Sequence, residues 1–126
     1  MSEGDARPLL SHERLDVFRL SRELAIDMHV KTSSMSSADR FGLASRIRRA
    51  SVSIPANIAE GAARSSRKES VRFLAIARGS SAELRVLLDI AHATGQIDKE
   101  VLLAGSVAVD RISSMISGLM RRNQAR

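Results

Sequence analysis

The residues best suited to chemistry in this sequence are arginines and one lysine gathered in its middle third. Guanidinium groups form forked hydrogen bonds with phosphate, so a cluster of them is typical of a polyanion-binding surface. Between residues 46 and 85 lie nine basic and three acidic residues, and this net charge of +6 equals that of the whole 126-residue chain. The candidate nucleic-acid-binding residues are Arg46, Arg48, Arg49, Arg64, Arg67, Lys68 and Arg72.

Six polar residues in the same region recur at helical spacing. At about 100° per residue they fall within a stripe of roughly 80°, beside an apolar stripe. They are Arg46, Arg49, Ser53, Asn57, Glu60 and Arg64. One interpretation is phosphate binding by the three arginines.

The other interpretation of the stripe is structural, with Ser53, Asn57 and Glu60 as its centre. Glu60 and Arg64 then pair at i, i+4, Asn57 satisfies the Ser51 carbonyl that Pro55 leaves without a donor, and the stripe forms a seam between subunits. Both interpretations hold together if a ring of subunits collects the arginines of several chains.

Three more bases, Arg67, Lys68 and Arg72, fall at the start of a predicted helix. A helix N-terminus attracts anions, and bases placed there strengthen that field. The alternative is a solvated charged face. The only aromatic residues are three phenylalanines at core-like positions, Phe18, Phe41 and Phe73, so stacking on bases is not expected. Binding through phosphates, with low sequence specificity, is the expected mode.

Signals for catalysis are weak. Asp89 and His92 have the carboxylate-x-x-His spacing of di-metal bundles, but such sites need a second copy of the motif and two more glutamates. Glu60 has no nucleophile near it in the sequence. No glycine-rich phosphate loop occurs, and the chain has no cysteine. We therefore expect no enzymatic activity, no metal and no cofactor.

Apolar periodicity and caps predict four helices that position these residues. They cover about 13–32, 37–64, 66–94 and 98–122, with capping residues at Ser36, Ser66 and Asp98 and a C-terminal glycine at Gly95. Pro55 lies inside the second helix; the apolar spacing keeps its phase across it, which favours one kinked helix over two short ones. The predicted fold is an all-α, antiparallel up-down four-helix bundle over residues 12–122. Residues 1–11 are expected to be a flexible lead-in and residues 123–126 a frayed tail.

Uncharged stretches fall short of the length of a membrane helix, and the N-terminus carries acids without an apolar segment. The sequence therefore predicts a cytoplasmic protein with no membrane contact.

The middle of the chain closely resembles one known family, the 23S rRNA-intervening sequence proteins. The resemblance is carried by Phe41-Gly42-Leu43, by the run RRASVSIPANIAEG from Arg48 to Gly61, by Arg64, and by FLAIARGS from Phe73 to Ser80 with Glu83-Leu84. It is dense over the second and third helices and looser toward both ends. Arg46 stands where the family tends to carry glutamine, and this extra arginine makes the basic face stronger here. Ala63 stands where glycine is frequent before Arg64.

The resemblance implies an all-helical bundle, ring-shaped homo-oligomers that are pentamers in known members, and a role with nucleic acid. The family is also distantly similar to the accessory proteins of diversity-generating retroelements, which are basic barrels that bind nucleic acid and a reverse transcriptase.

Together, these observations predict a non-catalytic oligomeric bundle that binds RNA or DNA through a basic face. The alternative is a structural module, or one that binds a protein partner, whose polar stripe is a homo-oligomer seam.

Overall fold

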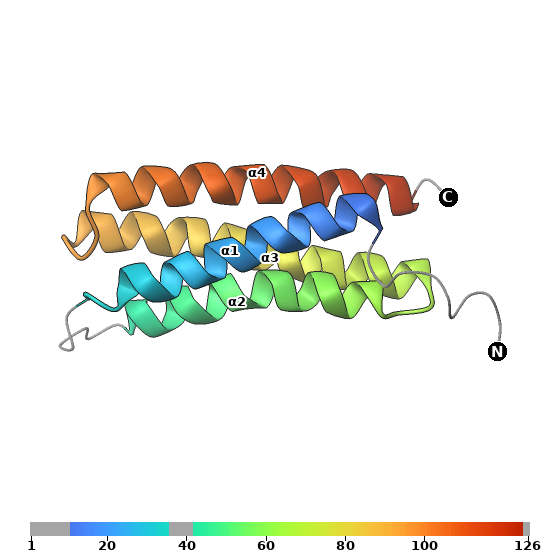
Figure 1. Ribbon diagram of the computed structural model, residues 1–126, viewed down its shortest axis with the longest axis horizontal. Helices are drawn as coiled ribbons and strands as arrows, with labels where there is room; N and C mark the ends of the chain where they lie inside the picture. Colours follow the sequence, from blue (N-terminus) through green and yellow to red (C-terminus); the bar gives the residue numbers. More distant parts are fainter. Residues whose placement is uncertain (1–10, 36–41, 125–126) are drawn as a thin grey trace.

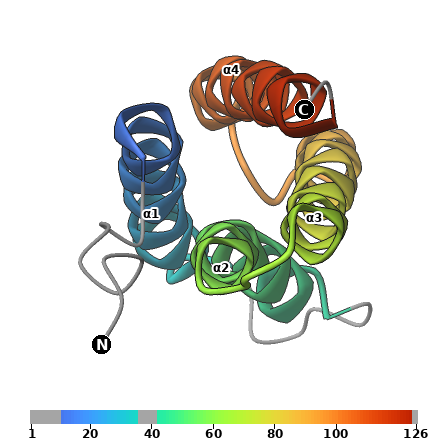
Figure 2. The same ribbon diagram turned by 90° about the vertical axis from the view of Figure 1, so that its right-hand side faces the viewer.

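The computed structural model describes residues 11–35 and 42–124, and these form four α-helices. They are α1 (His12–Thr32), α2 (Leu43–Ala62), α3 (Arg67–Ala93) and α4 (Lys99–Gln124). Consecutive helices run in opposite directions, and the four surround one core (Figures 1 and 2). Each helix packs against its neighbour in the chain, and α1 also packs against α4. The α1–α4 interface is the least extensive of the four. The predicted all-α four-helix bundle is confirmed.

Local signals in the sequence set three of the helix ends. Ser66 Oγ accepts from the Glu69 amide at 3.0 Å at the start of α3, and Asp98 Oδ1 accepts from the Val101 amide at 2.9 Å at the start of α4. At the end of α3, Gly95 has a φ of +79°. Its amide donates to the carbonyl of His92 and that of Gln96 to Ala91, which is the Schellman arrangement. These caps agree with the predictions.

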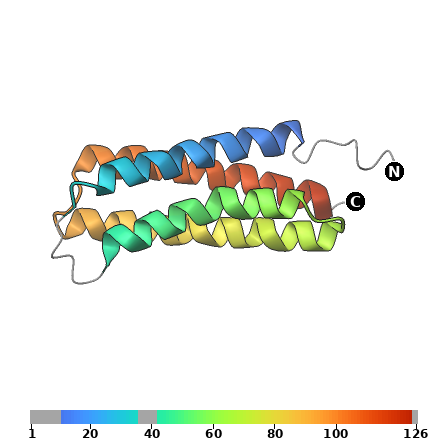
Figure 3. The same cartoon turned by 60° about the horizontal axis from the view of Figure 1, so that its bottom comes forward.

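The start of α2 differs from the prediction. The helix was expected from residue 37, but it begins at Leu43, because Gly42 adopts a φ of +62° that a right-handed helix cannot include. The predicted capping box at Ser36 and Asp39 lies outside the described residues. Downstream, α2 continues through the buried Pro55 as one helix beside α3 (Figure 3), which excludes two short helices. A kink at Pro55 stays a prediction.

The core consists of the aliphatic residues that the periodicity selects. Ile47, Ile54 and Ile58 of α2 are fully buried, as are Val17 of α1 and Ile116 of α4. At the start of the predicted tail, α4 continues to Gln124, and the side chain of Asn123 donates to the Leu119 carbonyl at 2.7 Å. Residues 125–126 lie outside the described part.

By length and composition α4 resembles a membrane span, with a mean hydropathy of 1.3 over its most apolar window. Core helices of soluble proteins share this property. Here Val109, Ile112, Ile116 and Leu119 of α4 are buried within the bundle. One face of α4 is therefore used in packing the four helices together, while Leu103 and Val107 of the same helix are 54% and 69% exposed.

Candidate nucleic-acid interface

The polar stripe of α2 faces α3 of the same chain. The hydroxyl of Ser53 lies 2.7 Å from that of Ser80, and the Arg46 guanidinium lies 3.9 Å from the Glu83 carboxylate. The stripe therefore borders an intramolecular seam between two helices, where the structural interpretation of the sequence expected a seam between subunits. Ser80 and Glu83 were missing from the predicted site. Their signal was present in their spacing, because they share the face of α3 that also carries Phe73 and Leu87.

Asn57 stabilises the stripe differently from the expectation. Its Nδ2 donates to the Ser53 carbonyl at 2.8 Å and to Ser53 Oγ at 3.0 Å. The predicted bond to the Ser51 carbonyl is wrong, because a helical side chain points back along its own face and reaches the residue four positions earlier. Asn57 thus fixes the position of the Ser53 hydroxyl, which in turn contacts α3.

At the far end of α2 a phenylalanine is flanked by two arginines. The guanidinium carbons of Arg64 and Arg72 lie 4.8 and 4.5 Å from the centre of the Phe73 ring. Phe73 was expected in the core, but it is only partly buried. Its ring makes cation–π contacts with both guanidinium groups. The predicted Glu60–Arg64 ion pair is confirmed. Arg64 is thus held by a carboxylate and by a ring.

Arg72 also pairs with Glu69 at 3.2 Å. The hydrogen bond from Arg72 is the largest cause that lowers the pKa of the exposed Glu69 carboxylate. Desolvation opposes it, and the positive charges of Arg72, Arg64 and Lys68 lower the pKa further. Glu69 is in the first turn of α3, where the N–H groups of the helix also favour an anion.

Arg48 departs most clearly from its predicted role. Its Nε donates to Thr32 Oγ1 at 2.8 Å, and that hydroxyl donates to the Met28 carbonyl at 2.6 Å. Arg48 lies on the side of α2 that faces α1, away from the stripe of Arg46 and Arg49. It therefore connects α2 to the last turn of α1, and we exclude it from the candidate interface.

The six other predicted bases form two groups along the α2–α3 side of the bundle. Arg46 and Arg49 lie near the start of α2, and the rest surround the turn between α2 and α3. Arg46 lies near the start of α2, and Arg64 lies just beyond its last residue, Ala62. The 16 residue steps from Arg46 to Ala62 alone correspond to about 24 Å of helix. Arg67 and Lys68 border a shallow surface hollow with Asn123 and Gln124 of α4. The predicted face is therefore elongated, with a basic group at each end.

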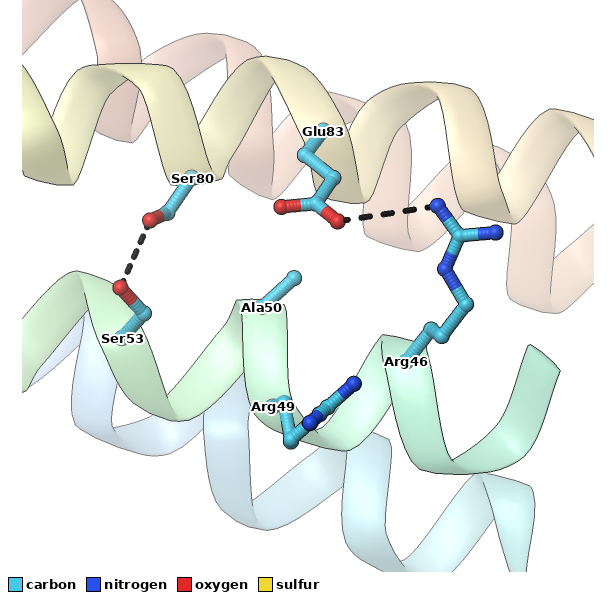
Figure 4. A pocket seen from close by; sticks show the side chains of 6 residues that line it. All are labelled: Arg46, Arg49, Ala50, Ser53, Ser80 and Glu83. Atoms are coloured by element: carbon cyan, nitrogen blue, oxygen red, sulfur yellow. Dashed lines mark hydrogen bonds and ion pairs between the residues drawn. The ribbon is translucent and has the colours of Figure 1, made fainter. Parts of the chain in front are cut away.

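The first group lines a cleft of about 220 Å³ between α2 and α3 (Figure 4). The lining residues are Arg46, Arg49, Ala50, Ser53, Ser80 and Glu83. Figure 4 shows Arg46 reaching toward Glu83, the Ser53–Ser80 pair at the opposite end, and Ala50 between them. Within the described part of the chain, no ion pair or hydrogen bond holds the exposed Arg49 side chain. The cleft thus combines two guanidinium groups, two hydroxyls and one carboxylate.

A buried cation that was not predicted lies close to the end of α2, where a Cβ on Gly61 would be 3.5 Å from Arg14 Nη1. Arg14 of α1 is 7% exposed, and its Nη1 has no hydrogen-bond partner among the described residues. Burial lowers the pKa of its guanidinium. The only sequence signal is its phase, because Arg14 precedes Val17 by three residues on the apolar face of the helix.

Asp89 and His92 lie in the last turns of α3 without a third ligand nearby. In the described ranges no group of three or more histidines and carboxylates is positioned to hold a metal ion. These two residues therefore carry no argument for a metal centre.

The comparison with known proteins identifies the family. Residues 13–118 match the family described as 23S rRNA-intervening sequence protein. The chain belongs to this family. The match spans all of α2 and α3, and so both basic groups of the candidate interface of this 23S rRNA-intervening sequence family member.

The fold of this family member is also similar to a solved structure. It is the crystal structure, at 1.70 Å resolution, of a protein with unknown function from the S23 ribosomal protein family of Bacteroides thetaiotaomicron VPI-5482. The two chains share 22% sequence identity over 86% of this chain and 98% of that chain, with a TM-score of 0.79. No curated protein matches the chain. The similarity supports the bundle fold, and neither match indicates a catalytic family.

Proposed function

We propose that this protein is a non-catalytic bundle that binds RNA or DNA through phosphate contacts along its α2–α3 side. The observation that carries the proposal is the distribution of charge. The whole net charge of +6 resides in residues 46–85, which fold into most of α2 and α3.

Three of the nine bases contact other helices, Arg48 with Thr32 of α1, Arg78 with Ser117 of α4 and Arg85 with Asp110 of α4. The six bases that remain on the α2–α3 side, against three glutamates, give this side an excess of three positive charges. A polyanion that binds such a side gains free energy by releasing its counterions.

The ion pairs on this side leave the arginines available to phosphate. In the Arg46–Glu83, Arg64–Glu60 and Arg72–Glu69 pairs, every side chain is more than 40% exposed. Exposed pairs contribute about 0 to 1 kcal/mol, so a polyanion with many phosphates competes with them. Arg49 adds a guanidinium that no carboxylate of the described chain neutralises.

The expected mode is contact with the backbone of the nucleic acid. The described chain contains two phenylalanines, both partly buried, and no tryptophan or tyrosine. Stacking platforms for single-stranded bases are built from exposed aromatic rings. We therefore expect low sequence specificity and strong salt dependence.

Fluorescence anisotropy with labelled RNA and DNA tests the proposal. Between about 50 and about 200 mM salt, affinity should fall by at least an order of magnitude. Arg49→Gln combined with Lys68→Gln should weaken binding at low salt, whereas Arg111→Gln on the exposed surface of α4 is the matched control. Binding that ignores salt, or that is affected equally by the control, would contradict phosphate contacts by this surface.

A second candidate function is self-association, with a protein-interaction role, which we propose from the exposed apolar residues of α3. Ile76, Val86 and Ile90 are 40%, 57% and 41% exposed, and with Gly79 and Glu83 they recur at spacings of three and four. Such a second face on a core helix is typical of a helix that packs against another subunit. A ring such as the pentamer implied by the family would place basic clefts of several chains together, in the cytoplasm.

Sedimentation velocity tests self-association. Val86→Glu should shift the oligomer to the monomer without loss of helical content, while Ser114→Glu on the exposed side of α4 should not. A monomeric parent protein at high concentration would exclude this second function and leave nucleic-acid binding to be judged separately.

A further inference from the structure

The cleft between α2 and α3 contains hydrogen-bond donors and acceptors that are not hydrogen-bonded to other described residues of the chain. Arg46 and Glu83 are separated by 3.9 Å, which is beyond hydrogen-bonding distance. The two charges attract each other, but the N–H donors of Arg46 and the acceptor positions of Glu83 remain available. Arg49 supplies a second guanidinium at the same cleft.

The serine pair adds one more donor. Ser53 and Ser80 each carry one hydroxyl hydrogen, and the bond between their oxygens uses only one of the two. Asn57 donates to the Ser53 oxygen and consumes no hydroxyl hydrogen. Whichever serine donates across the seam, one O–H therefore remains for a ligand. Both serines line the same cleft as the two guanidinium groups, at the end opposite the Arg46–Glu83 pair.

We propose that this cleft binds the terminal phosphate monoester of a nucleotide, with Glu83 accepting a hydrogen bond from a hydroxyl of the attached sugar. A monoester has three terminal oxygens and a charge between −1.5 and −2 at neutral pH, in round numbers. Two guanidinium groups and one hydroxyl match those three oxygens. An internal phosphodiester has one charge and two free oxygens, and it offers no reason for a carboxylate at the site.

The shape of the cleft agrees with a small polar group. Ala50 lies between the two ends of the cleft in Figure 4 and leaves space between the polar side chains. The Ser53–Ser80 and Arg46–Glu83 pairs close the two ends, each with one residue from α2 and one from α3. A phosphate at this position contacts both helices at once.

The inference rests on the proposed function in that a strand with a 5′-phosphate is one source of such a group; a free nucleoside monophosphate is the other. The test uses the full-length protein and two RNA strands of one sequence, labelled at the 3′ end, one with a 5′-phosphate and one with a 5′-hydroxyl. The phosphorylated strand should bind about tenfold more tightly, as expected for a few charge-assisted hydrogen bonds. Arg49→Gln should reduce the ratio toward one, and Arg111→Gln should leave it unchanged. Because the two strands share all backbone contacts, the ratio is insensitive to weaker general binding.

Calorimetry with adenosine 5′-monophosphate separates the two proposals. Equal affinity for both strands, with no heat from the monophosphate, would overturn the terminal-phosphate site and leave the proposed function intact. Binding of the monophosphate that Arg49→Gln abolishes, with no binding of either strand, would support the site and overturn the proposed function. If inorganic phosphate bound as tightly as the monophosphate, and Glu83→Gln changed neither, the assignment of the sugar contact to Glu83 would be wrong.

Discussion

Arg48 Nε donates a 2.8 Å hydrogen bond to the hydroxyl of Thr32, sixteen residues earlier in the chain. This bond joins α2 to the last turn of α1, directly before the connection between the two helices. Arg48 therefore has a structural contact with α1, whereas Arg46 and Arg49, close to it in the sequence, line the cleft between α2 and α3.

Removing this bond should lower stability and leave nucleic-acid binding unchanged. Thr32→Val and Arg48→Gln should each reduce the free energy of unfolding by about 1 kcal/mol, the usual contribution of one hydrogen bond. Because both changes remove the same interaction, the double variant should lose less free energy of unfolding than the sum of the two single losses. Urea denaturation measures these differences. Weaker RNA binding by Arg48→Gln at unchanged stability would show that Arg48 acts at the interface.

Replacing the buried Arg14 should stabilise the bundle. Its Nη1 is buried without a partner among the described residues, and a buried unpaired cation is costly. Arg14→Met should raise the free energy of unfolding by about 1 to 3 kcal/mol, whereas Arg22→Met, on the exposed side of α1, should change it by less than about 0.5 kcal/mol.

The pH dependence of Arg14 follows from its lowered pKa. The unfolded chain holds the guanidinium proton of Arg14 more tightly than the folded chain does. The destabilising effect of Arg14 is therefore present at neutral pH and is relieved only in strongly alkaline solution. A loss of stability in Arg14→Met would instead indicate that the guanidinium has a partner that it needs.

Glu69 should make the bundle sensitive to acid. Its pKa is lowered from an ordinary value of 4.5, so its contribution to stability is present above that pH and disappears as the pH falls through the lowered value. Thermal unfolding should show Glu69→Gln less stable than the parent at neutral pH, with the two converging in acid. Arg72→Gln should raise the pKa of Glu69 in an NMR titration, because it removes the main cause of the shift; an unchanged pKa would contradict this.

Two glycines inside helices should respond in opposite directions to alanine. A Cβ on Gly61 would lie 3.1 Å from both the Ser70 carbonyl oxygen and the Phe73 Cβ, where α2 and α3 approach closely. Gly61→Ala should therefore destabilise the protein by about 1 to 3 kcal/mol. A Cβ on Gly79 meets nothing within 4 Å, so Gly79→Ala should stabilise it by about 0.5 to 1 kcal/mol through helix propensity alone. Equal effects in chemical denaturation would contradict the close approach at Gly61.

Local patterns were enough to predict the helices. Caps such as Ser66 and Asp98 bond to amides three residues away, and apolar spacing selects the buried face of each helix. The Glu60–Arg64 pair is equally local, since one helical turn brings the two side chains together. The sequence by itself thus determined the four-helix bundle and the concentration of the net positive charge in the middle of the chain.

The tertiary structure decided which basic residues are engaged and what surrounds them. Ser53 and Ser80 are 27 residues apart, and Arg46 and Glu83 belong to different helices. Whether such residues meet depends on the rotation and register of α2 against α3, which the packing of the whole core sets. The composition of the cleft, the engagement of Arg48 with α1 and the burial of Arg14 therefore followed only from the folded bundle.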